Sequence, residues 1–423
     1  MWIHSGKIGE KMKFEDLNII NEILGALKAK NYVSPTPIQA AAIGPVLAGK
    51  DLLGCAQTGT GKTAAFAIPI LQNLVKNNCY QKGIKVLILT PTRELAIQIR
   101  DSFREYGAEL PFKCSVIFGG VNQHSQVEVL KKGVDILVAT PGRLLDLIKQ
   151  KHAKLDAVQC LVLDEADNML DMGFIHDVKR VVSELPEQRQ TLLFSATMPE
   201  EIEELANKFL NKPEKVVITP VASTVDTIKQ SLYYVDKPNK PALLLALLKA
   251  EDVESALIFT KTKHGADKLV RILEKNNIKS VAIHGNKAQN TRQKNLSDFK
   301  SRAVKILVAT DIAARGIDIS GLSHVFNYEM PDVPETYVHR IGRTGRANKT
   351  GIAISLANFD EKNNVKDIQR LIKKDIPVVY EHDFPMQILV KTPKQPPQKK
   401  FISNKSIQKK VKPEKTRNRK NYR

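Results

Sequence analysis

Short runs of consecutive apolar residues recur along the chain, separated by longer stretches whose apolar residues repeat with helical spacing. This alternation predicts parallel sheets with helices on both faces, because a strand that is covered on both sides needs no polar face. The runs form two series, so we expect two doubly wound α/β domains. The first series lies at 51–55, 85–90, 114–118, 135–140, 160–165 and 190–197. The second lies at 256–260, 280–284, 304–310, 324–329 and 351–355.

Breaks in this pattern give the expected domain boundaries. Pro220 and small polar residues interrupt the pattern near 219–226, and after Asp383 the apolar periodicity gives way to Pro, Lys, Gln and Asn. A segment of that composition buries too little apolar surface to fold. We expect an N-terminal extension at 1–11, a first domain at 12–218, a linker at 219–228, a second domain at 229–383 and a disordered basic tail at 384–423. An early helical pattern runs through Ile19, Ile20, Ile23, Leu24 and Leu27.

The charge of the chain is concentrated in this tail. The 423 residues carry a formal net charge of +20. From Gln387 to Arg423 there are 13 Lys and Arg against the single Glu414, a net of +12, which leaves +8 for the first 386 residues. An excess of this size favours an anionic polymer or surface as partner, although a basic tail can also serve solubility alone.

The cysteines and the apolar content bear on the cellular compartment. The four cysteines are scattered without a CxxC pair, so we expect reduced residues, mostly in the core: Cys55, Cys79, Cys114 and Cys160. No run of 18 apolar residues occurs, and the first residues lack the apolar region of a secretion signal. We expect a soluble, cytoplasmic protein with no membrane partner.

The segment from Ala56 to Thr63, AQTGTGKT, directly follows the first apolar run. A strand, a glycine-rich turn and a helix in this order can cradle phosphates with backbone N–H groups at the helix N-terminus. Lys62 would then reach the β- and γ-phosphates, and the Thr63 hydroxyl would hold Mg²⁺. The general phosphate-loop pattern has Gly where this chain has Ala56, so an ordinary glycine turn before a helix stays open at this point.

Two further segments add candidate chemistry. Asp164 stands at the end of an apolar strand, where it can hold the Mg²⁺ of a nucleotide, and Glu165 beside it can orient or deprotonate water. The alternative is a pair of solvated acids at a helix cap. Upstream, Pro35 and Pro37 stiffen the chain before a helix that carries Gln39, whose amide matches the N6 and N7 edge of adenine. A plain capping loop is the alternative there.

These motifs together resemble the DEAD-box ATP-dependent RNA helicases over roughly residues 12 to 380, and most closely their bacterial RhlE-like branch. The sequence DEAD itself stands at 164–167. The other matching motifs are Phe14 with PTPIQ at 35–39 (a Q motif over 12–40), AQTGTGKT at 56–63, PTRELA at 91–96, GG at 119–120, TPGR at 140–143, SAT at 195–197, QNTR at 289–292, ATDIAARGIDI at 309–319 and HRIGRTGR at 339–346. Asn31 departs from the Gly that is usual before the aromatic residue of its loop.

The resemblance implies a role for each matching residue. Phe14 would pack on the adenine, Asp318 would meet the ribose, and Arg343 and Arg346 would be arginine fingers on one helical face; solvated basic residues on a helix are the alternative. The implied nucleotide site comprises Phe14, Gln39, Ala56, Gln57, Thr58, Gly59, Thr60, Gly61, Lys62, Thr63 and Asp318. The implied catalytic residues are Lys62, Glu165, Arg343 and Arg346, and the metal ligands are Thr63 and Asp164. Residues that would couple hydrolysis to RNA are Asp167, Ser195, Thr197 and His339. The implied RNA contacts are Arg93, Gly120, Thr140, Arg143, Gly285, Gln289, Arg292 and Thr310.

The family's properties give the expected fold and activity. Its members have two tandem RecA-like domains, use ATP and Mg²⁺, and hydrolyse ATP to ADP and phosphate when RNA stimulates them. They close on ATP and single-stranded RNA, contact its backbone with little sequence specificity, and separate short duplexes locally. An ATP-gated RNA clamp and a DNA translocase are the rival functions. The resemblance also implies a monomer with ribosomal or RNA-decay protein partners. With one Trp and nine Tyr in the chain, we expect no aromatic stacking platform.

Overall fold

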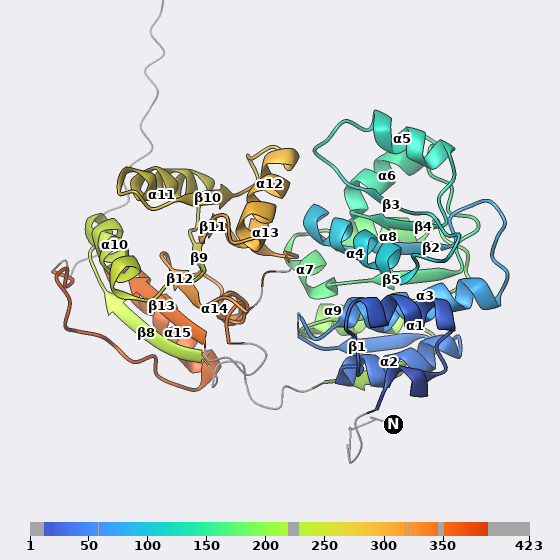
Figure 1. Cartoon of the computed structure of the whole chain (residues 1–423), viewed down its shortest axis with the longest axis horizontal. Helices are drawn as coiled ribbons and strands as arrows, with labels where there is room; N and C mark the ends of the chain where they lie inside the picture. The colour runs from blue at the N-terminus through green and yellow to red at the C-terminus, as the bar shows by residue number, and fades with distance from the viewer. Residues whose placement is uncertain are drawn as a thin grey trace, which may run out of the picture.

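The computed structural model contains two α/β domains that lie side by side, and it describes residues 12–57, 59–218, 228–317, 319, 321–345 and 351–387. In Figure 1 the first domain is coloured blue to green and lies on the right, and the second lies on the left. Strands pair in parallel in both sheets. The predicted architecture of two doubly wound parallel sheets is therefore confirmed.

The first domain has a seven-stranded sheet with the strand order β3-β4-β2-β5-β6-β1-β7. The strands are β1 Leu52–Cys55, β2 Val86–Leu89, β3 Cys114–Ile117, β4 Ile136–Ala139, β5 Cys160–Leu163, β6 Gln190–Ser195 and β7 Glu214–Val217. The helices are η1 Phe14–Leu17, α1 Asn21–Ala29, α2 Pro37–Leu47, α3 Lys62–Lys76, α4 Arg93–Tyr106, α5 His124–Lys131, α6 Pro141–Lys149, α7 Ala166–Asp171, α8 Ile175–Val182 and α9 Glu200–Phe209.

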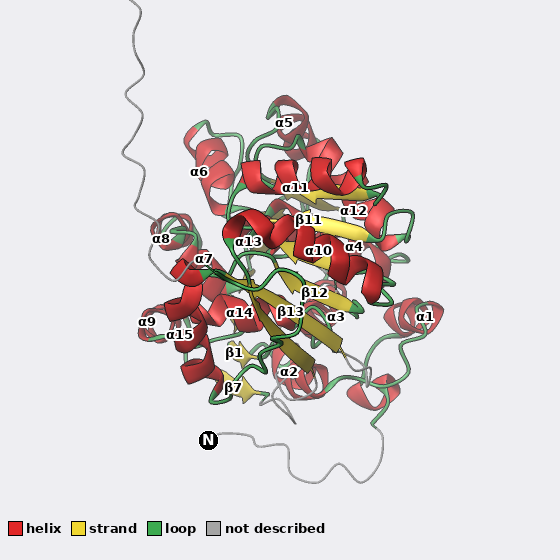
Figure 2. Cartoon of the chain, turned by 90° about the vertical axis from the view of Figure 1, so that its left-hand side faces the viewer, coloured by secondary structure: helices red, strands yellow, loops and turns green. Residues whose placement is uncertain are grey.

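The second domain has a six-stranded sheet with the order β10-β11-β9-β12-β13-β8, and helices cover both of its faces (Figure 2). The strands are β8 Ile228–Tyr234, β9 Ala256–Phe259, β10 Ser280–Ile283, β11 Ile306–Ala309, β12 His324–Asn327 and β13 Gly351–Ala357. The helices are η2 Lys237–Asn239, α10 Lys240–Ala250, α11 Lys263–Lys275, α12 Gln289–Lys300, α13 Asp311–Ala314, α14 Pro334–Ile341, η3 Phe359–Glu361 and α15 Lys362–Ile372.

Burial on both faces explains the continuous apolar runs. In β2, Val86 and Ile88 belong to the core cluster on one face of the first sheet, and Leu87 and Leu89 belong to the cluster on the other face. Successive side chains of a strand point to opposite faces, so a strand covered on both sides is apolar at every position. Each predicted run overlaps one of the observed strands.

Two strands do not follow this rule and were missed from the sequence. β7 alternates between buried and exposed positions, and β8 includes the polar residues Lys229, Gln230 and Ser231. Both lie at an edge of their sheet, where one side is open to solvent and polar side chains are tolerated. The early helical pattern was also wrong in part, because α1 begins only at Asn21. Asn18, with φ of 55°, ends the short helix η1 in the left-handed conformation, so the chain turns before α1.

The ends of the chain are described only in part. Residues 1–11 and the predicted tail beyond Gln387 lie outside the described residues. Residues 384–387, which the sequence assigned to the tail, still bond to the second domain: Met386 N donates to Tyr234 O at 3.2 Å, and Gln387 N donates to Asp236 Oδ2 at 3.0 Å. Among the described residues, no helix is both long and apolar enough to cross a bilayer.

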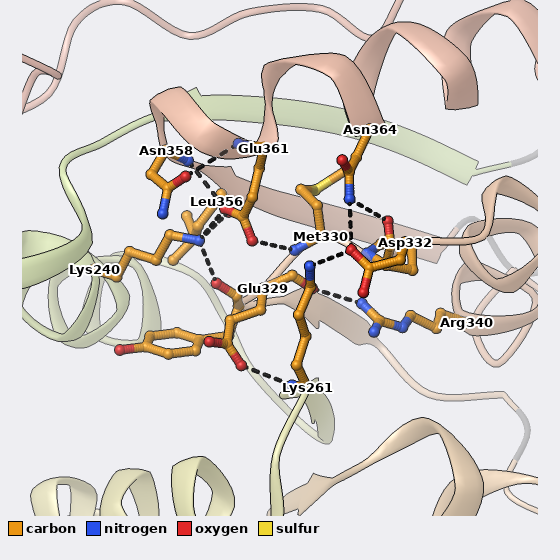
Figure 3. A network of polar contacts seen from close by, with 12 residues as sticks. Lys240, Lys261, Glu329, Met330, Asp332, Arg340, Leu356, Asn358, Glu361 and Asn364 are labelled. Atoms are coloured by element: carbon orange, nitrogen blue, oxygen red, sulfur yellow. Dashed lines mark hydrogen bonds and ion pairs between the residues drawn. The ribbon is translucent and has the colours of Figure 1, made fainter. Parts of the chain in front are cut away.

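A buried ion pair ties together the ends of three elements in the second domain (Figure 3). Lys240, whose side chain is 2% exposed, donates to Glu361 Oε2 at 2.6 Å and to the carbonyl oxygens of Tyr328 and Leu356. The other oxygen of Glu361 accepts from Met330 N at 3.0 Å. All three ammonium protons of Lys240 thus have acceptors, which offsets the cost of burying the charge. The network fixes the loops that leave β12 and β13.

Candidate functional site

The glycine-rich segment has the predicted order of strand, turn and helix. β1 ends at Cys55, and α3 begins at Lys62, directly after Gly61 in the left-handed conformation with φ of 91°. A side chain on Gly61 would be strained, and its Cβ would collide with the Gln39 amide. Lys62 is buried and donates from Nζ to Ala56 O at 2.8 Å. A loop of this form, at the start of a 15-residue helix, can receive phosphate oxygens.

Gln39 lies beside this loop, in the first turn of α2. Its Oε1 accepts from Thr36 N at 2.9 Å, and its Nε2 donates to Gly61 O at 3.1 Å, so the amide joins the helix start to the phosphate loop. A glutamine amide has a second N–H and a second oxygen lone pair, which remain for a base. Phe14 lies in the core cluster of this domain and is only 2% exposed, so most of its ring already packs against protein.

The two acids of the predicted metal and water site follow β5 directly. Asp164 and Glu165 are both buried. Burial raises the pKa of Asp164 to about 7, against the opposing effect of the Lys62 ammonium. The pKa of Glu165 is also raised, because the effect of burial exceeds the opposing effects of the positive charges on Lys62 and Arg343. Glu165 has a φ of 53°, a left-handed conformation that is uncommon for a residue with a side chain and is concentrated at functional sites.

Asp167 connects the acids to the loop that follows β6. Its Oδ2 accepts from the backbone N–H groups of Ala196 and Thr197, at 3.1 and 2.9 Å, and from the Thr197 hydroxyl at 3.1 Å. Asp167 N donates to Ser195 Oγ at 3.3 Å, and this hydroxyl donates to Thr197 O at 2.7 Å. The structure therefore brings together the three first-domain residues that were predicted to couple the site to RNA.

The second domain reaches this site through α14 and the loop after it. A cavity of about 270 Å³ between the domains is lined by Gln57, Asn168, Ala196 and Thr197 of the first domain and by Arg315, Glu335, Val338, His339, Gly342, Arg343 and Leu371 of the second. Arg343 donates from Nη1 to Ile317 O at 2.8 Å, and its positive charge opposes the upward pKa shift of Glu165. Burial lowers the pKa of His339, and the facing Asp167 carboxylate opposes that effect.

The predicted placement of the two arginines on one helical face was wrong for Arg343. α14 ends at Ile341, so Arg343 follows the helix in a turn. Thr344 forms a bridge with Leu322 of the neighbouring segment, and Gly345 has a φ of 66°, so the backbone leaves the helical path here. Arg343 is positioned by its bond to Ile317 O. Arg346 lies outside the described residues, as do Thr58 and Asp318 of the predicted nucleotide site.

Three of the predicted RNA contacts meet at the boundary between the domains. Gln289 Nε2 donates to Glu94 Oε1 at 2.9 Å, Arg292 forms an ion pair with Glu94 Oε2 at 3.0 Å, and Arg93 Nη1 donates to Gln289 Oε1 at 3.5 Å. Burial, followed by repulsion from Arg292, lowers the pKa of Arg93, and Arg143 adds to this effect. Positive charges crowded in this way favour an anion such as a phosphate group.

Two of these arginines keep a buried N–H without an acceptor among the described residues: Arg143 at Nη1 and Arg292 at Nε. A buried donor left unpaired is costly, so these N–H groups are suited to donate to an oxygen of a ligand. Arg143 donates from Nη2 to Val121 O at 3.1 Å. The other predicted RNA residues lie at strand ends or in adjoining loops: Gly120 against the Arg93 guanidinium, Thr140 after β4, Gly285 after β10 and Thr310 after β11.

Close backbone packing supports the contact between the domains. Gly316 of the second domain has a φ of 68°, and a Cβ there would collide with the Thr92 hydroxyl of the first domain. Arg315 Nη2 also forms an ion pair with Asp171 Oδ2 at 2.8 Å. Since neither contact involves residues that are near in the sequence, no spacing pattern could have predicted them.

Sequence reasoning gave no role to three residues that the geometry places in the site. Glu94 binds two predicted RNA contacts, Asn168 Nδ2 donates to Glu165 Oε2 at 3.0 Å, and Arg315 lines the cavity. Glu94 and Arg315 stand inside motifs that the sequence did identify, PTRELA and ATDIAARGIDI, and Asn168 directly follows DEAD. That position is the only signal that could have drawn attention to them.

The family comparisons match both halves of the chain. Residues 36–205 match the family model for DEAD/DEAH box helicases, and residues 239–348 match that of the helicase conserved C-terminal domain. The DEAD-box ATP-dependent RNA helicase RhpA of Helicobacter pylori is 43% identical over 371 residues, which cover 88% of this chain and 75% of that protein. CshA of Bacillus subtilis, also a DEAD-box ATP-dependent RNA helicase, is 42% identical over 361 residues, covering 85% and 72%.

Two solved structures of similar chains differ in how well they superimpose. S. cerevisiae Dbp5 bound to RNA and ADP BeF3 has a TM-score of 0.77 at 31% identity, covering 88% of this chain and 96% of that one. A DEAD box protein from the hyperthermophile Methanococcus jannaschii has a TM-score of 0.52 at 40% identity, covering 87% and 99%. The more similar sequence thus has the less similar structure, although nearly the whole chain is compared in both cases.

Proposed function

The chain belongs to the DEAD-box family of ATP-dependent RNA helicases, whose members are RNA-stimulated ATPases, and we propose that it closes on ATP and single-stranded RNA to separate short RNA duplexes locally. The observation that carries this proposal is the cavity between the domains, which is lined by Asn168 and Thr197 of the first domain and by His339 and Arg343 of the second. A catalytic set that is divided between two domains is complete only when the domains close, so closure and hydrolysis are linked.

The phosphate loop and the buried acids fit ATP with Mg²⁺. The phosphates would lie against the N-terminus of α3, where Lys62 can exchange its bond to Ala56 O for a phosphate oxygen. Mg²⁺ is usually held by one or two carboxylates, by hydroxyls and by substrate phosphates, and Asp164 with Thr63 offers such a set. Burial disfavours the ionised form of Asp164 and raises its pKa, and a bound cation would stabilise that ionised form. The bound Mg²⁺ would neutralise charge that develops on the phosphates.

Glu165 and Arg343 would carry the chemical step. Glu165 is held by Asn168 at the end of β5, with its carboxylate available to orient the attacking water and to take its proton. Arg343 would stabilise the charge that builds on the γ-phosphate, as arginine fingers do in related phosphoryl-transfer enzymes. We propose the same role for Arg346 on the family pattern alone.

The RNA backbone would replace protein contacts at the boundary between the domains. Arg93, Arg143 and Arg292 form a cluster with two unpaired N–H groups, which phosphate oxygens would satisfy. The similarity to the yeast protein Dbp5 bound to RNA and ADP BeF3, with a TM-score of 0.77, supports this proposal. Asp167, Ser195 and Thr197 would relay closure to the hydrolytic site through the bonds described above.

Measuring ATP turnover with and without single-stranded RNA, together with displacement of a short RNA duplex, tests this function. We expect RNA to raise turnover and ATP to drive strand separation. Turnover that stays slow while the protein remains on RNA through many ATP lifetimes would favour the ATP-gated clamp instead. Stimulation by DNA equal to that by RNA would favour the translocase.

We expect Gln39→Ala to weaken ATP binding by about 1–3 kcal/mol, the usual loss when a hydrogen-bonding partner is removed. The binding of GTP should be weakened less, because only adenine presents the acceptor and donor that the amide matches. Calorimetry with ATP and with GTP on the same variant measures both losses, and GTP serves as the internal control. Equal losses would mean that Gln39 acts only through its bond to the phosphate loop at Gly61 O.

A further inference from the structure

A second cavity lies in the second domain, beside the end of the edge strand β8. It has a volume of about 530 Å³ and is lined by Tyr234, Lys362, Lys366, Val378, Val379, Tyr380, His382, Pro385 and Met386. This volume falls within the range of about 300–1,000 Å³ that small-molecule sites occupy, so one or two nucleotides fit it. None of the residues given a role in ATP or RNA binding above lines this cavity.

The segment that follows α15 forms the outer wall of the cavity. It is bonded to β8 at two places: Leu232 exchanges backbone bonds of 2.9 Å with Pro377 O and Val379 N, and Met386 N donates to Tyr234 O at 3.2 Å. The wall is therefore held by backbone bonds on both sides, and Tyr380, which lies between them in the sequence, is 79% exposed.

The lining combines aromatic rings with positive charge. Tyr234 and Tyr380 both line the cavity. The Lys362 ammonium lies 5.7 Å from the centre of the Tyr234 ring, and the His382 ring lies 5.5 Å from that of Tyr233. Among the described residues, the charged side chains of the lining are Lys362 and Lys366, and no carboxylate belongs to it. This chemistry suits a planar base beside a phosphate.

The position of the cavity relates it to the RNA contacts. All six strands of the second sheet run parallel, and Gly285 and Thr310 follow the carboxyl ends of β10 and β11. Tyr234 stands at the carboxyl end of β8, so it lies along the same edge of the sheet. β8 is five strand spacings from β10 in the sheet order, a separation of about 24 Å at about 4.8 Å for each spacing. A single strand of RNA that bound at both sites would have to span this distance.

We propose that this cavity, which we call the Tyr380 pocket, binds a base and phosphate of single-stranded RNA beyond the segment held between the domains. The inference rests on the proposed RNA-binding function and adds a second contact to it. An exposed tyrosine gives a face on which any base can stack, and the two lysines give the charge that a backbone phosphate needs.

The test measures the affinity of the full-length protein, without nucleotide, for labelled oligouridines of about 6 and about 30 nucleotides by fluorescence anisotropy. We expect Tyr380→Ala to lower the affinity for the long strand about fivefold or more, the range of one lost stacking contact. The affinity for the short strand should not change. Tyr380→Phe should bind as the wild type does, because the ring is retained. Lys366→Glu should weaken the long strand and reduce its salt dependence.

Matched controls separate the pocket from general surface effects. Tyr80→Ala removes a tyrosine of the first domain that is 57% exposed, and Lys208→Glu reverses an exposed charge on α9; both should bind the long strand as the wild type does. Photo-crosslinking of a thiouridine-labelled strand should place an adduct within residues 378–386.

Each outcome of this test decides between the two proposals. If Tyr380→Ala bound the long strand as tightly as the wild type and no adduct formed within residues 378–386, the proposal that the pocket binds RNA would be overturned. An equal loss of affinity in Tyr80→Ala would also overturn it. If the wild-type protein itself bound neither strand, the proposed RNA function would fail rather than the pocket alone.

Discussion

Replacing Glu165 with Gln should lower kcat for ATP hydrolysis by about 10²- to 10⁴-fold, the usual contribution of a positioned general base. An amide oxygen can still accept the bond from Asn168 Nδ2, so the side chain should keep its place. An amide cannot take a proton from the attacking water, however. Single-turnover hydrolysis with saturating RNA isolates this step from binding and product release.

The same variant should bind ATP and RNA as tightly as the wild type and should remain longer on RNA, because opening of the domains follows hydrolysis in the proposed cycle. Its thermal melting should match that of the wild type, since the substitution preserves the shape of the side chain. A suitable control is Glu200→Gln, which removes an exposed carboxylate at the start of α9. Near-normal turnover in Glu165→Gln would remove this residue from the chemical step.

The predictable part of the fold consists of strands that are buried on both faces. Val86 to Leu89 must be apolar throughout because helices cover each side of β2. The resulting apolar run can be recognised in the sequence without knowing which strands lie next to β2. β8 is an edge strand that includes the polar residues Lys229, Gln230 and Ser231, so its sequence does not differ from that of a loop. It is recognised as a strand only once its partner β13 is known, and β13 is far away in the chain.

The site was predictable where a motif fixes both the residue and its neighbours along the chain. The phosphate loop is such a case, since Gly61 and Lys62 define a turn and a helix start by themselves. Glu94 is the opposite case, because its place in the site depends on its bonds to Gln289 and Arg292, which belong to the other domain. The helical face expected for Arg343 failed for a similar reason, because the bridge between Thr344 and Leu322 takes the backbone out of the helix.

The proposed Tyr380 pocket departs from the expectation that the chain has no stacking platform. Counting one Trp and nine Tyr led us to expect no platform for bases, but the number of rings says nothing about where they gather. Tyr234 and Tyr380 come from the first strand and the last described segment of the second domain, and backbone bonds between these segments bring them to one cavity. A stacking site built from distant residues leaves no local pattern in the sequence.

Arg343→Ala should reduce RNA-stimulated ATP hydrolysis by about 10³- to 10⁵-fold, the range that an arginine finger contributes in related phosphoryl-transfer enzymes. RNA binding measured without nucleotide should remain, because Arg343 is not among the residues of the arginine cluster at the domain boundary. The expected loss lies in kcat, since the guanidinium stabilises charge that appears only as the γ-phosphate is transferred. Steady-state ATPase assays at saturating RNA, paired with RNA affinity by anisotropy, measure both quantities.

Arg343→Lys distinguishes the charge of this side chain from its shape. Lysine keeps the positive charge near Glu165 but cannot both donate to Ile317 O, as Arg343 does at 2.8 Å, and present a planar fork to a phosphate. We therefore expect Arg343→Lys to recover only a small part of the lost rate. A melting temperature near that of the wild type for both variants would show that the loss is catalytic rather than structural. Stimulation by RNA at the wild-type level in Arg343→Ala would exclude this arginine from the mechanism. Domain closure would then not complete the catalytic site through Arg343.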